Sequence, residues 1–306
     1  MNRLQVIKGN EITADLFNGF VEYIDGSPKT IETYTRALKQ FYKWLHEEGI
    51  TKPTRADILH YRDYSKSHHA AATTQNYIIA VRQFFKWLAQ EGIYKNVAEN
   101  VKGAKLDRRH KKDPLTIAQI KDIMNTLDTQ DTQGKRDYSI FILALTGGMR
   151  TIEIQRANIE DMRTAGADTV LYIQGKGKEE KTEYIKLTPI VEKAIRTYLK
   201  TRGDTQPTDP LFGSNSDRNN GGRLTTKSIS RLIKNAFIKA GYDSDRLTAH
   251  SLRHTAGTLN LINGGTLEET QQLLRHSNIN TTMIYLHHLE RAKNCSEARI
   301  ADAIFN

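Results

Sequence analysis

Apolar residues in the first hundred positions of the chain recur with the period of a helix, and the same pattern occurs twice. The matching apolar positions are Tyr34, Ala37, Leu38, Phe41 and Leu45 in the first copy, and Tyr77, Ala80, Val81, Phe84 and Leu88 in the second. This spacing predicts two amphipathic helices. With another helix expected from Thr54 to about Ser67, it predicts a small helical bundle over residues 12 to 100, whose aromatic stripe forms the core.

The pattern changes after residue 114, where helical segments surround one β-rich stretch. Residues 169–174 and 181–187 favour two strands around a charged glycine turn, and the apolar run at 137–147 predicts a buried helix. Further helix starts are marked by capping residues, which are Thr116 with Gln119, Thr188 before Pro189, Thr225 or Thr226, and Thr266 with Glu269. The predicted fold class is mainly α, with an N-terminal helical domain and a C-terminal mixed α domain that contains a small β-hairpin.

Composition narrows the class of protein. The chain of 306 residues carries 45 Lys and Arg against 35 Asp and Glu, a formal net charge of +10, which favours a polyanionic partner such as nucleic acid. Its apolar runs are shorter than a membrane span requires, and a single cysteine, Cys295, excludes an internal disulfide. These features predict a soluble protein of the reducing cytoplasm, with no membrane partner.

Positive charge is concentrated in residues 102–114, which lack apolar periodicity and end at Asp113-Pro114. We expect this segment to link domains at 1–101 and 115–287, with a C-terminal tail at 288–306. Its cations are either solvated or in contact with a phosphate backbone. The candidate DNA-binding residues of the linker are Lys102, Lys105, Arg108, Arg109, Lys111 and Lys112. Those on the polar faces of the repeated helices are Lys39, Lys43, Arg82 and Lys86.

Residues suited to phosphate chemistry follow one another in the second domain. They are Arg150 with Glu153, Lys176 in a Gly-Lys-Gly turn, His250 with Arg253, His276, and Tyr285. His250 and Arg253 stand three residues apart, so on a helix both project from one face. Taken singly, each residue is ordinary, because such groups usually form surface ion pairs or pack in cores. In this order they resemble the catalytic signature of the tyrosine recombinases, the phage integrase family.

The resemblance covers roughly residues 12 to 290 and implies catalytic roles. Arg150 and Arg253 would clamp the scissile phosphate, Tyr285 would be the nucleophile, and Glu153 would hold the site geometry. Attack of a phenol on a phosphodiester builds negative charge on the non-bridging oxygens, which two forked guanidiniums can stabilise. The energy of the broken bond is kept in a 3′ phosphotyrosine, so we expect neither a cofactor nor a metal ion.

Proton transfer is assigned to the lysine and histidines of the signature. Lys176 would protonate the leaving 5′ oxygen, with Lys178 and Lys181 of the same turn as alternatives. His250 is the leading general base for the phenol of Tyr285. His276 would hydrogen-bond the scissile phosphate.

Three positions depart from the usual motifs of the family. Met149 stands where leucine is usual before Arg150, and Ala249 replaces a common proline. Arg275 replaces the glycine that usually precedes His276, which removes a flexible residue from that turn. None of these changes touches a reacting group, but Arg275 is expected to affect the local backbone.

The resemblance implies a site-specific recombinase that acts on double-stranded DNA, as a dimer on each site and a tetramer in synapsis, with a directionality factor as an optional partner. Integration or excision of a mobile element is the first interpretation, and Xer-like resolution of chromosome or plasmid dimers is the alternative. A remote third is a DNA-binding protein of the same fold that does not cleave. The tail either docks on its own domain or is passed to a neighbouring protomer.

Overall fold

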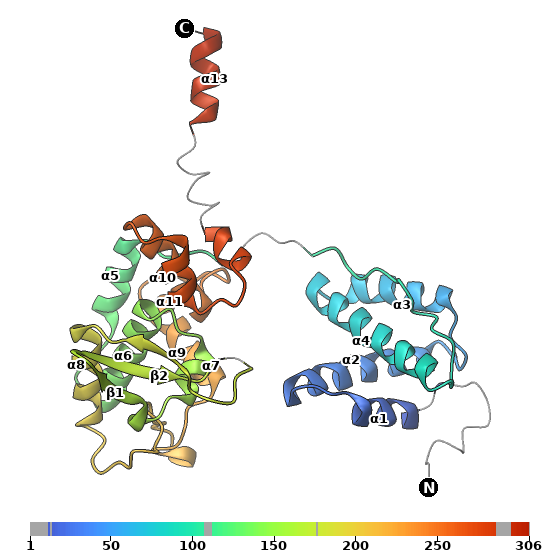
Figure 1. The fold of residues 1–306 in the computed structure, drawn as a ribbon, viewed down its shortest axis with the longest axis horizontal. Coiled ribbons are helices and arrows are strands. Elements are labelled where there is room, and N and C mark those ends of the chain that lie inside the picture. Colours follow the sequence, from blue (N-terminus) through green and yellow to red (C-terminus); the bar gives the residue numbers. More distant parts are fainter. Residues whose placement is uncertain (1–11, 13, 107–111, 176, 286–294, 306) are drawn as a thin grey trace. The chain divides into compact units, whose positions relative to one another are not determined.

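The computed structural model describes residues 12, 14–106, 112–175, 177–285 and 295–305, and the chain divides into two compact units, Met1–Arg109 and His110–Asn306 (Figure 1). No helix in these described ranges is long and apolar enough to cross a membrane. The predicted linker cations Arg108, Arg109 and Lys111 lie outside the described residues.

The N-terminal unit is a bundle of α1 (Ala14–Tyr23), α2 (Pro28–Glu47), α3 (Arg55–His68) and α4 (Ala71–Gln90). The hydroxyl of Ser27 accepts a hydrogen bond from the Thr30 backbone N–H at 3.2 Å and so fixes the start of α2. Helices α2 and α4 carry the two copies of the repeated pattern and pack on each other. Phe41 and Phe84 of the stripe are fully buried, so the predicted aromatic core is confirmed.

The second unit is built mainly of helices around one buried helix, α6. Its helices are α5 (Ile117–Thr126), α6 (Thr132–Thr146), α7 (Thr151–Arg156), α8 (Pro189–Leu199), α9 (Thr226–Lys239), α10 (Ala249–Ile262) and α11 (Leu267–Leu274), with short 3-10 turns at Ile159–Asp161 and Asp217–Asn219. Helix α6 packs against α8, α9 and α10. The predicted caps at Thr116 and Thr266 are present as capping boxes, and Thr225 rather than Thr226 caps α9.

The predicted start of α6 at residue 137 is wrong. The helix begins at Thr132, because the Asp131 carboxylate accepts a hydrogen bond from the Gly134 backbone N–H at 2.6 Å and caps a polar first turn. The sequence prediction followed the apolar run and therefore missed this turn.

A three-stranded antiparallel sheet lies in the same unit, with the order β1 (Met162–Ala165), β2 (Asp168–Ile173) and β3 (Glu183–Lys186). Leu171 of β2 pairs with Met162 on one side and Ile185 on the other. The predicted hairpin corresponds to β2 and β3. Strand β1 was missed, because it is short and largely exposed and so lacks the alternation that marks a half-buried strand.

A last helix, α13 (Ser296–Phe305), lies near the C-terminus. Its apolar residues Ile300, Ile304 and Phe305 are exposed. Residues 286–294, where the predicted tail begins, lie outside the described residues.

Candidate active site

A glycine turn after α6 positions Arg150. Gly148 has φ +54, and a Cβ there would lie 2.7 Å from the Leu274 side chain, so this position requires glycine. The turn leads into α7, at which Arg150 is the N-cap residue and Glu153 the third helical residue. The Glu153 carboxylate accepts hydrogen bonds from the Arg150 backbone N–H at 2.8 Å and from its Nη1 at 2.7 Å. Glu153 therefore binds both the backbone and the side chain of Arg150.

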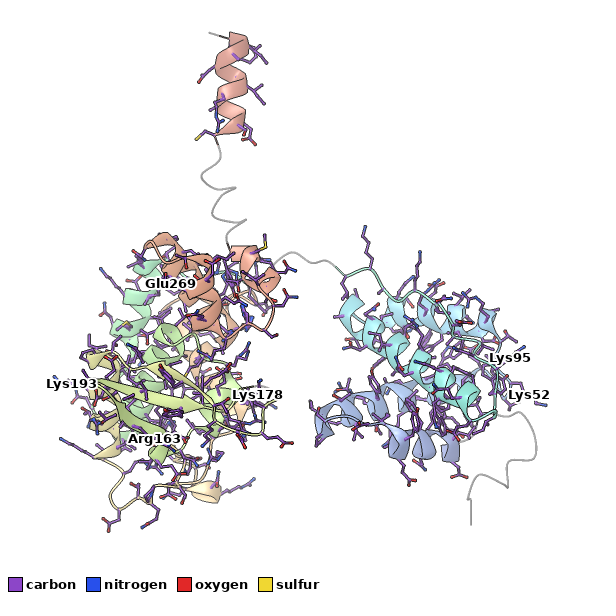
Figure 2. All side chains as sticks on the ribbon, in the orientation of Figure 1. Lys52, Lys95, Arg163, Lys178, Lys193 and Glu269 are labelled. Atoms are coloured by element: carbon purple, nitrogen blue, oxygen red, sulfur yellow. The ribbon has the colours of Figure 1, made fainter. Side chains whose placement is uncertain are left out.

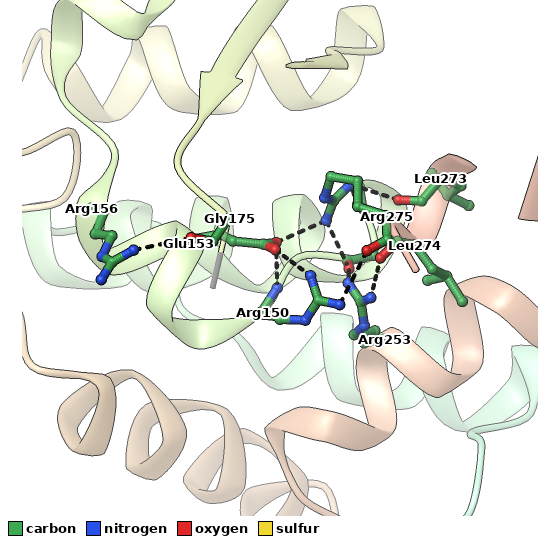
Figure 3. A network of polar contacts seen from close by, with 10 residues as sticks. Arg150, Glu153, Arg156, Gly175, Arg253, Leu273, Leu274 and Arg275 are labelled. Carbon is green, nitrogen blue, oxygen red and sulfur yellow. Dashed lines mark hydrogen bonds and ion pairs between the residues drawn. The ribbon is translucent and has the colours of Figure 1, made fainter. Parts of the chain in front are cut away.

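Helix α10 brings Arg253 to the same turn. Its Nη1 donates to the Gly148 carbonyl at 2.5 Å, and its Nη2 donates to the Leu274 carbonyl (Figure 3). The side chain is fully buried, and burial together with the nearby charge of Arg150 lowers its pKa to about 9. The guanidinium therefore stays charged at neutral pH. His250, on the same helix, is exposed.

Arg275 completes the cluster from the end of α11. Its backbone is left-handed, with φ 51 and ψ 50, so the arginine adopts the conformation that the usual glycine would take. Its Nη2 donates to the Glu153 carboxylate at 2.8 Å, and its carbonyl accepts from Arg150 Nη2 at 3.3 Å (Figure 3). Burial raises the pKa of Glu153, but the charge of Arg275 and the hydrogen bonds from Arg150 and Arg275 hold this pKa below its usual range. Sequence reasoning did not find this role for Arg275.

Tyr285 lies beside two histidine rings. The ring of His276 is nearly parallel to that of Tyr285, with centroids 6.3 Å apart, and the ring of His254 meets it edge-on at 4.6 Å. Tyr285 is only 3% exposed, and burial raises the pKa of its phenol, while the charges of Arg253 and Arg150 oppose that shift. The phenol is therefore protonated at neutral pH, and it would need a base in order to attack a phosphate.

His276 is held by Thr282, a buried residue that sequence reasoning missed. The Thr282 hydroxyl lies 2.9 Å from His276 Nδ1. Burial and the charges of Arg253, Arg150 and His250 lower the pKa of His276 to about 4, so its imidazole is neutral at neutral pH. When Thr282 donates this bond, the ring carries its hydrogen on Nε2 and can donate it to a phosphate. No motif marks Thr282, because the contact depends on the path of the chain after α11.

The turn between β2 and β3 carries the candidate general acids. Lys176 lies outside the described residues. Lys181 Nζ is 2.6 Å from the carboxylate of Asp161, which is 2% exposed, so Lys181 forms an ion pair with a buried carboxylate. Lys178 lies on this turn (Figure 2). Arg156 Nη1 donates to the Gly175 carbonyl at 3.1 Å and anchors α7 to the residue before Lys176.

The candidate DNA-binding residues stay a prediction. Lys39, Lys43, Arg82 and Lys86 are exposed on α2 and α4, off the buried stripe, as are Lys102 and Lys105 farther along. Lys43 pairs with Glu47 at 3.5 Å on the surface. Lys112 donates to the Asp245 carbonyl at 2.6 Å, so it is tied to the second unit. Within the described ranges, no three His, Cys, Asp or Glu side chains form a group that could hold a metal ion.

Comparison with known families and proteins gives a consistent assignment. The phage integrase family model matches residues 114–291, and the model of the phage integrase N-terminal SAM-like domain matches residues 17–92. The tyrosine recombinase XerA of Pyrococcus horikoshii is 31% identical over 278 residues, which cover 90% of this chain and 89% of the relative. XerC of Pelobacter propionicus is 29% identical over 272 residues, 85% of each chain. With XerC of Caldanaerobacter subterraneus subsp. tengcongensis the identity is 34%, over 63% of this chain and about half (52%) of that protein.

Solved structures share the fold. The XerH recombinase in a post-cleavage complex with its difH substrate matches with a TM-score of 0.71 and 20% identity, over 86% of this chain and 78% of that one. A lambda integrase tetramer bound to a Holliday junction matches with a TM-score of 0.69 and 17% identity, over 90% and 78%. Since the catalytic family model alone matches more than half of the chain, the chain belongs to the phage integrase family, the tyrosine recombinases.

Proposed function

We propose that this chain is a site-specific DNA recombinase that cuts and rejoins double-stranded DNA through a 3′ phosphotyrosine at Tyr285. The observation that carries the proposal is the convergence of Tyr285, His276, Arg150 and Arg253: the Tyr285 and His276 rings face each other with centroids 6.3 Å apart, and the charges of the two arginines act on both rings. A phenol beside two guanidiniums suits attack on a phosphodiester, because the guanidiniums stabilise the charge that develops on phosphorus-bound oxygens. DNA binding alone does not require that phenol.

The Tyr285 oxygen bonds to phosphorus as its proton passes to His250, the bond from phosphorus to the 5′ oxygen breaks, and that oxygen takes a proton from Lys176. The phosphate stays on the 3′ oxygen as a tyrosine ester, so a 5′ hydroxyl from another strand can reverse the step without ATP. Arg150 and Arg253 would bind the non-bridging oxygens, His276 would donate to one of them, and Glu153 would hold Arg150.

The decisive experiment compares the wild type with Tyr285→Phe on duplexes that flank the protein's own reading frame, nicked so that cleaved strands cannot rejoin. Denaturing gels should show a protein–DNA adduct with the wild type and none with the variant, while both bind the duplex in a mobility-shift assay. An adduct that persists in Tyr285→Phe would exclude Tyr285 as the nucleophile. Binding without an adduct on any duplex would favour the non-catalytic DNA-binding protein.

The general acid can be identified by changing the leaving group. A 5′-phosphorothiolate bridge releases a thiol, which leaves without a proton because its pKa is far below that of an alcohol. Lys176→Ala should cleave ordinary DNA slowly and the phosphorothiolate substrate at nearly the wild-type rate. Lys178→Ala is the matched control, and it should cleave both normally. If Lys178→Ala alone shows the rescue, the acid is Lys178.

For the biological role, we propose integration or excision of a mobile element, with Xer-like dimer resolution as the second candidate. The second candidate is supported by relatives named XerA and XerC that match 85% or more of this chain. Adduct formation on a site beside the protein's own gene would favour the first role. Recombination between two distant chromosomal or plasmid sites in direct repeat would favour the second.

We propose that the protein acts on DNA as an oligomer. A dimer on each site and a tetramer in synapsis are supported by the lambda integrase structures, which were solved as a dimer on a core site and a tetramer on a Holliday junction. The exposed apolar face of α13 would dock on a neighbouring protomer, so a chain that ends before Ser296 should bind two adjacent sites without cooperativity. We also propose that the protein acts in the cytoplasm, with a directionality factor as an optional partner.

A further inference from the structure

Arg275 has surroundings that are unusual for an arginine. It is a non-glycine residue in the left-handed region, a conformation that L side chains disfavour. Its side chain is only 4% exposed, whereas that of Arg150 is 28% exposed. A charged side chain that is buried on a strained backbone requires several specific partners.

The guanidinium of Arg275 has such partners on three segments. Its Nη1 donates to the carbonyls of Gly147 at 3.2 Å and Leu273 at 2.6 Å, and its Nη2 donates to the Gly148 carbonyl at 3.1 Å and the Glu153 carboxylate at 2.8 Å (Figure 3). A guanidinium has four N–H donors on its terminal nitrogens, so these four contacts use them all. Arg275 therefore presents no fork of donors to a phosphate.

We propose that Arg275 is a positioning residue for DNA cleavage, which holds the glycine turn, Glu153 and the end of α11 in one arrangement. Its four acceptors lie next to the groups that orient the two phosphate-binding arginines. Arg150 is oriented by Glu153 and by the carbonyl of Arg275 itself. Arg253 is oriented by the carbonyls of Gly148 and Leu274. Arg275 thus fixes the spacing between Arg150 and Arg253. This role in cleavage rests on the proposed recombinase function.

The test uses two replacements of Arg275 in the full chain. Arg275→Gly suits the left-handed backbone and removes all donors, whereas Arg275→Lys keeps the charge without the fork. The matched control is Arg196→Ala, which removes one exposed cation from α8. Adduct formation is measured in a single turnover on the nicked duplex that reacts with the wild type, and affinity for the same duplex is measured by mobility shift.

We expect Arg275→Gly to slow cleavage by about 10- to 100-fold, the scale of a small misplacement of reacting groups, with little change in affinity. Arg275→Lys should lie between it and the wild type, and the control should match the wild type. A loss of cleavage and affinity by the same factor would overturn the positioning role.

The pH profile of cleavage separates positioning from a general loss of structure. Glu153 faces Arg150, Arg253 and Arg275, and removing Arg275 takes away the strongest of the charges that keep its carboxyl ionised. The acid limb of the cleavage profile should therefore move to higher pH in Arg275→Gly. A wild-type rate and profile in Arg275→Gly would overturn the inference. If that variant does not fold, a wild-type rate and profile in Arg275→Lys would do so.

Failure of the proposed function gives a different result. If the wild type itself forms no adduct on any duplex, the recombinase proposal fails, and the role of Arg275 fails with it. If the wild type forms the adduct and the Arg275 variants match it, only the positioning role fails.

Discussion

Replacing Glu153 by glutamine should destabilise the second unit strongly. Glu153 is fully buried and lies within 2.8 Å of both Arg150 and Arg275, and the Arg275 side chain is itself buried. Glutamine has nearly the same shape, so the change removes mainly the charge and leaves Arg275 without its counter-ion. Breaking a buried ion pair from one side costs about 3–5 kcal/mol. For a unit of this size that corresponds to a fall in Tm of roughly 6–20 °C.

Urea denaturation is the suitable assay, because guanidinium chloride would screen the ion pairs under test. The two tryptophans of the chain, Trp44 and Trp87, both lie in the N-terminal unit, so their fluorescence reports that unit alone. Far-UV circular dichroism reports the helices of both units. We expect Glu153→Gln to shift the dichroism transition and leave the fluorescence transition in place.

The control for this experiment is Glu192→Gln on α8, which removes a surface pair with Arg196. Exposed pairs contribute about 0–1 kcal/mol. Equal effects of the two replacements would refute the argument that burial sets the loss of stability.

Acid denaturation provides a second test of Glu153. A carboxyl with a lowered pKa stabilises the fold above its unfolded pKa, and that stability is lost as pH falls through the folded pKa. The component of this loss that Glu153 contributes should be absent in Glu153→Gln.

Three further replacements test other parts of the site. Partial burial and the charges of Arg253 and Arg150 lower the pKa of His276 to about 4, so native His276 binds fewer protons than an unfolded histidine, and stability should rise from about pH 4 to about 6.5. His276→Gln should reduce that rise by about 1–2 kcal/mol in urea titrations across this range, since solvent screens part of the full shift. Arg156→Ala should slow cleavage of ordinary DNA but not of phosphorothiolate DNA, because it frees the Gly175 carbonyl at the base of the lysine turn. In thermal denaturation, Gly148→Ala should cost about 1–3 kcal/mol more than Gly49→Ala, where φ is also positive but a Cβ has open space.

The parts of the fold that the sequence predicts are those with local causes. The repeated helices follow from apolar spacing, and the starts of α5, α9 and α11 follow from capping residues a few positions away. The first turn of α6 was missed because it is polar, although Asp131 marks it. Strand β1 was missed because it is short and exposed, so its pairing with β2 decides its structure more than its own residues do.

The candidate site also has parts that the sequence predicts and parts that only the fold shows. The order of Arg150, His250, Arg253, His276 and Tyr285 is visible along the chain, because each residue belongs to a short motif. Their mutual support is not visible, because it depends on contacts between distant positions. Arg275 and Glu153 are 122 residues apart in the chain, and the contact between Arg253 and the glycine turn spans 105. In the sequence, arginine in place of the usual glycine at position 275 indicates only a local change in one turn. In the fold, the Arg275 side chain connects three segments.

The positive charges of Arg150, Arg253 and Arg275 lie close together, and their mutual repulsion destabilises the fold. The same repulsion favours binding of a negatively charged group. Burial and then the charge of Arg150 lower the pKa of Arg253 to about 9, so the arginines repel one another despite the carboxylate and carbonyls among them. A phosphate between Arg150 and Arg253 would supply negative charge at that point. The pentacoordinate state carries more negative charge than the phosphodiester, so the remaining repulsion is relieved further as the reaction proceeds. In the proposed mechanism, groups that hold the arginines close, Arg275 among them, would therefore favour the transition state over the bound substrate.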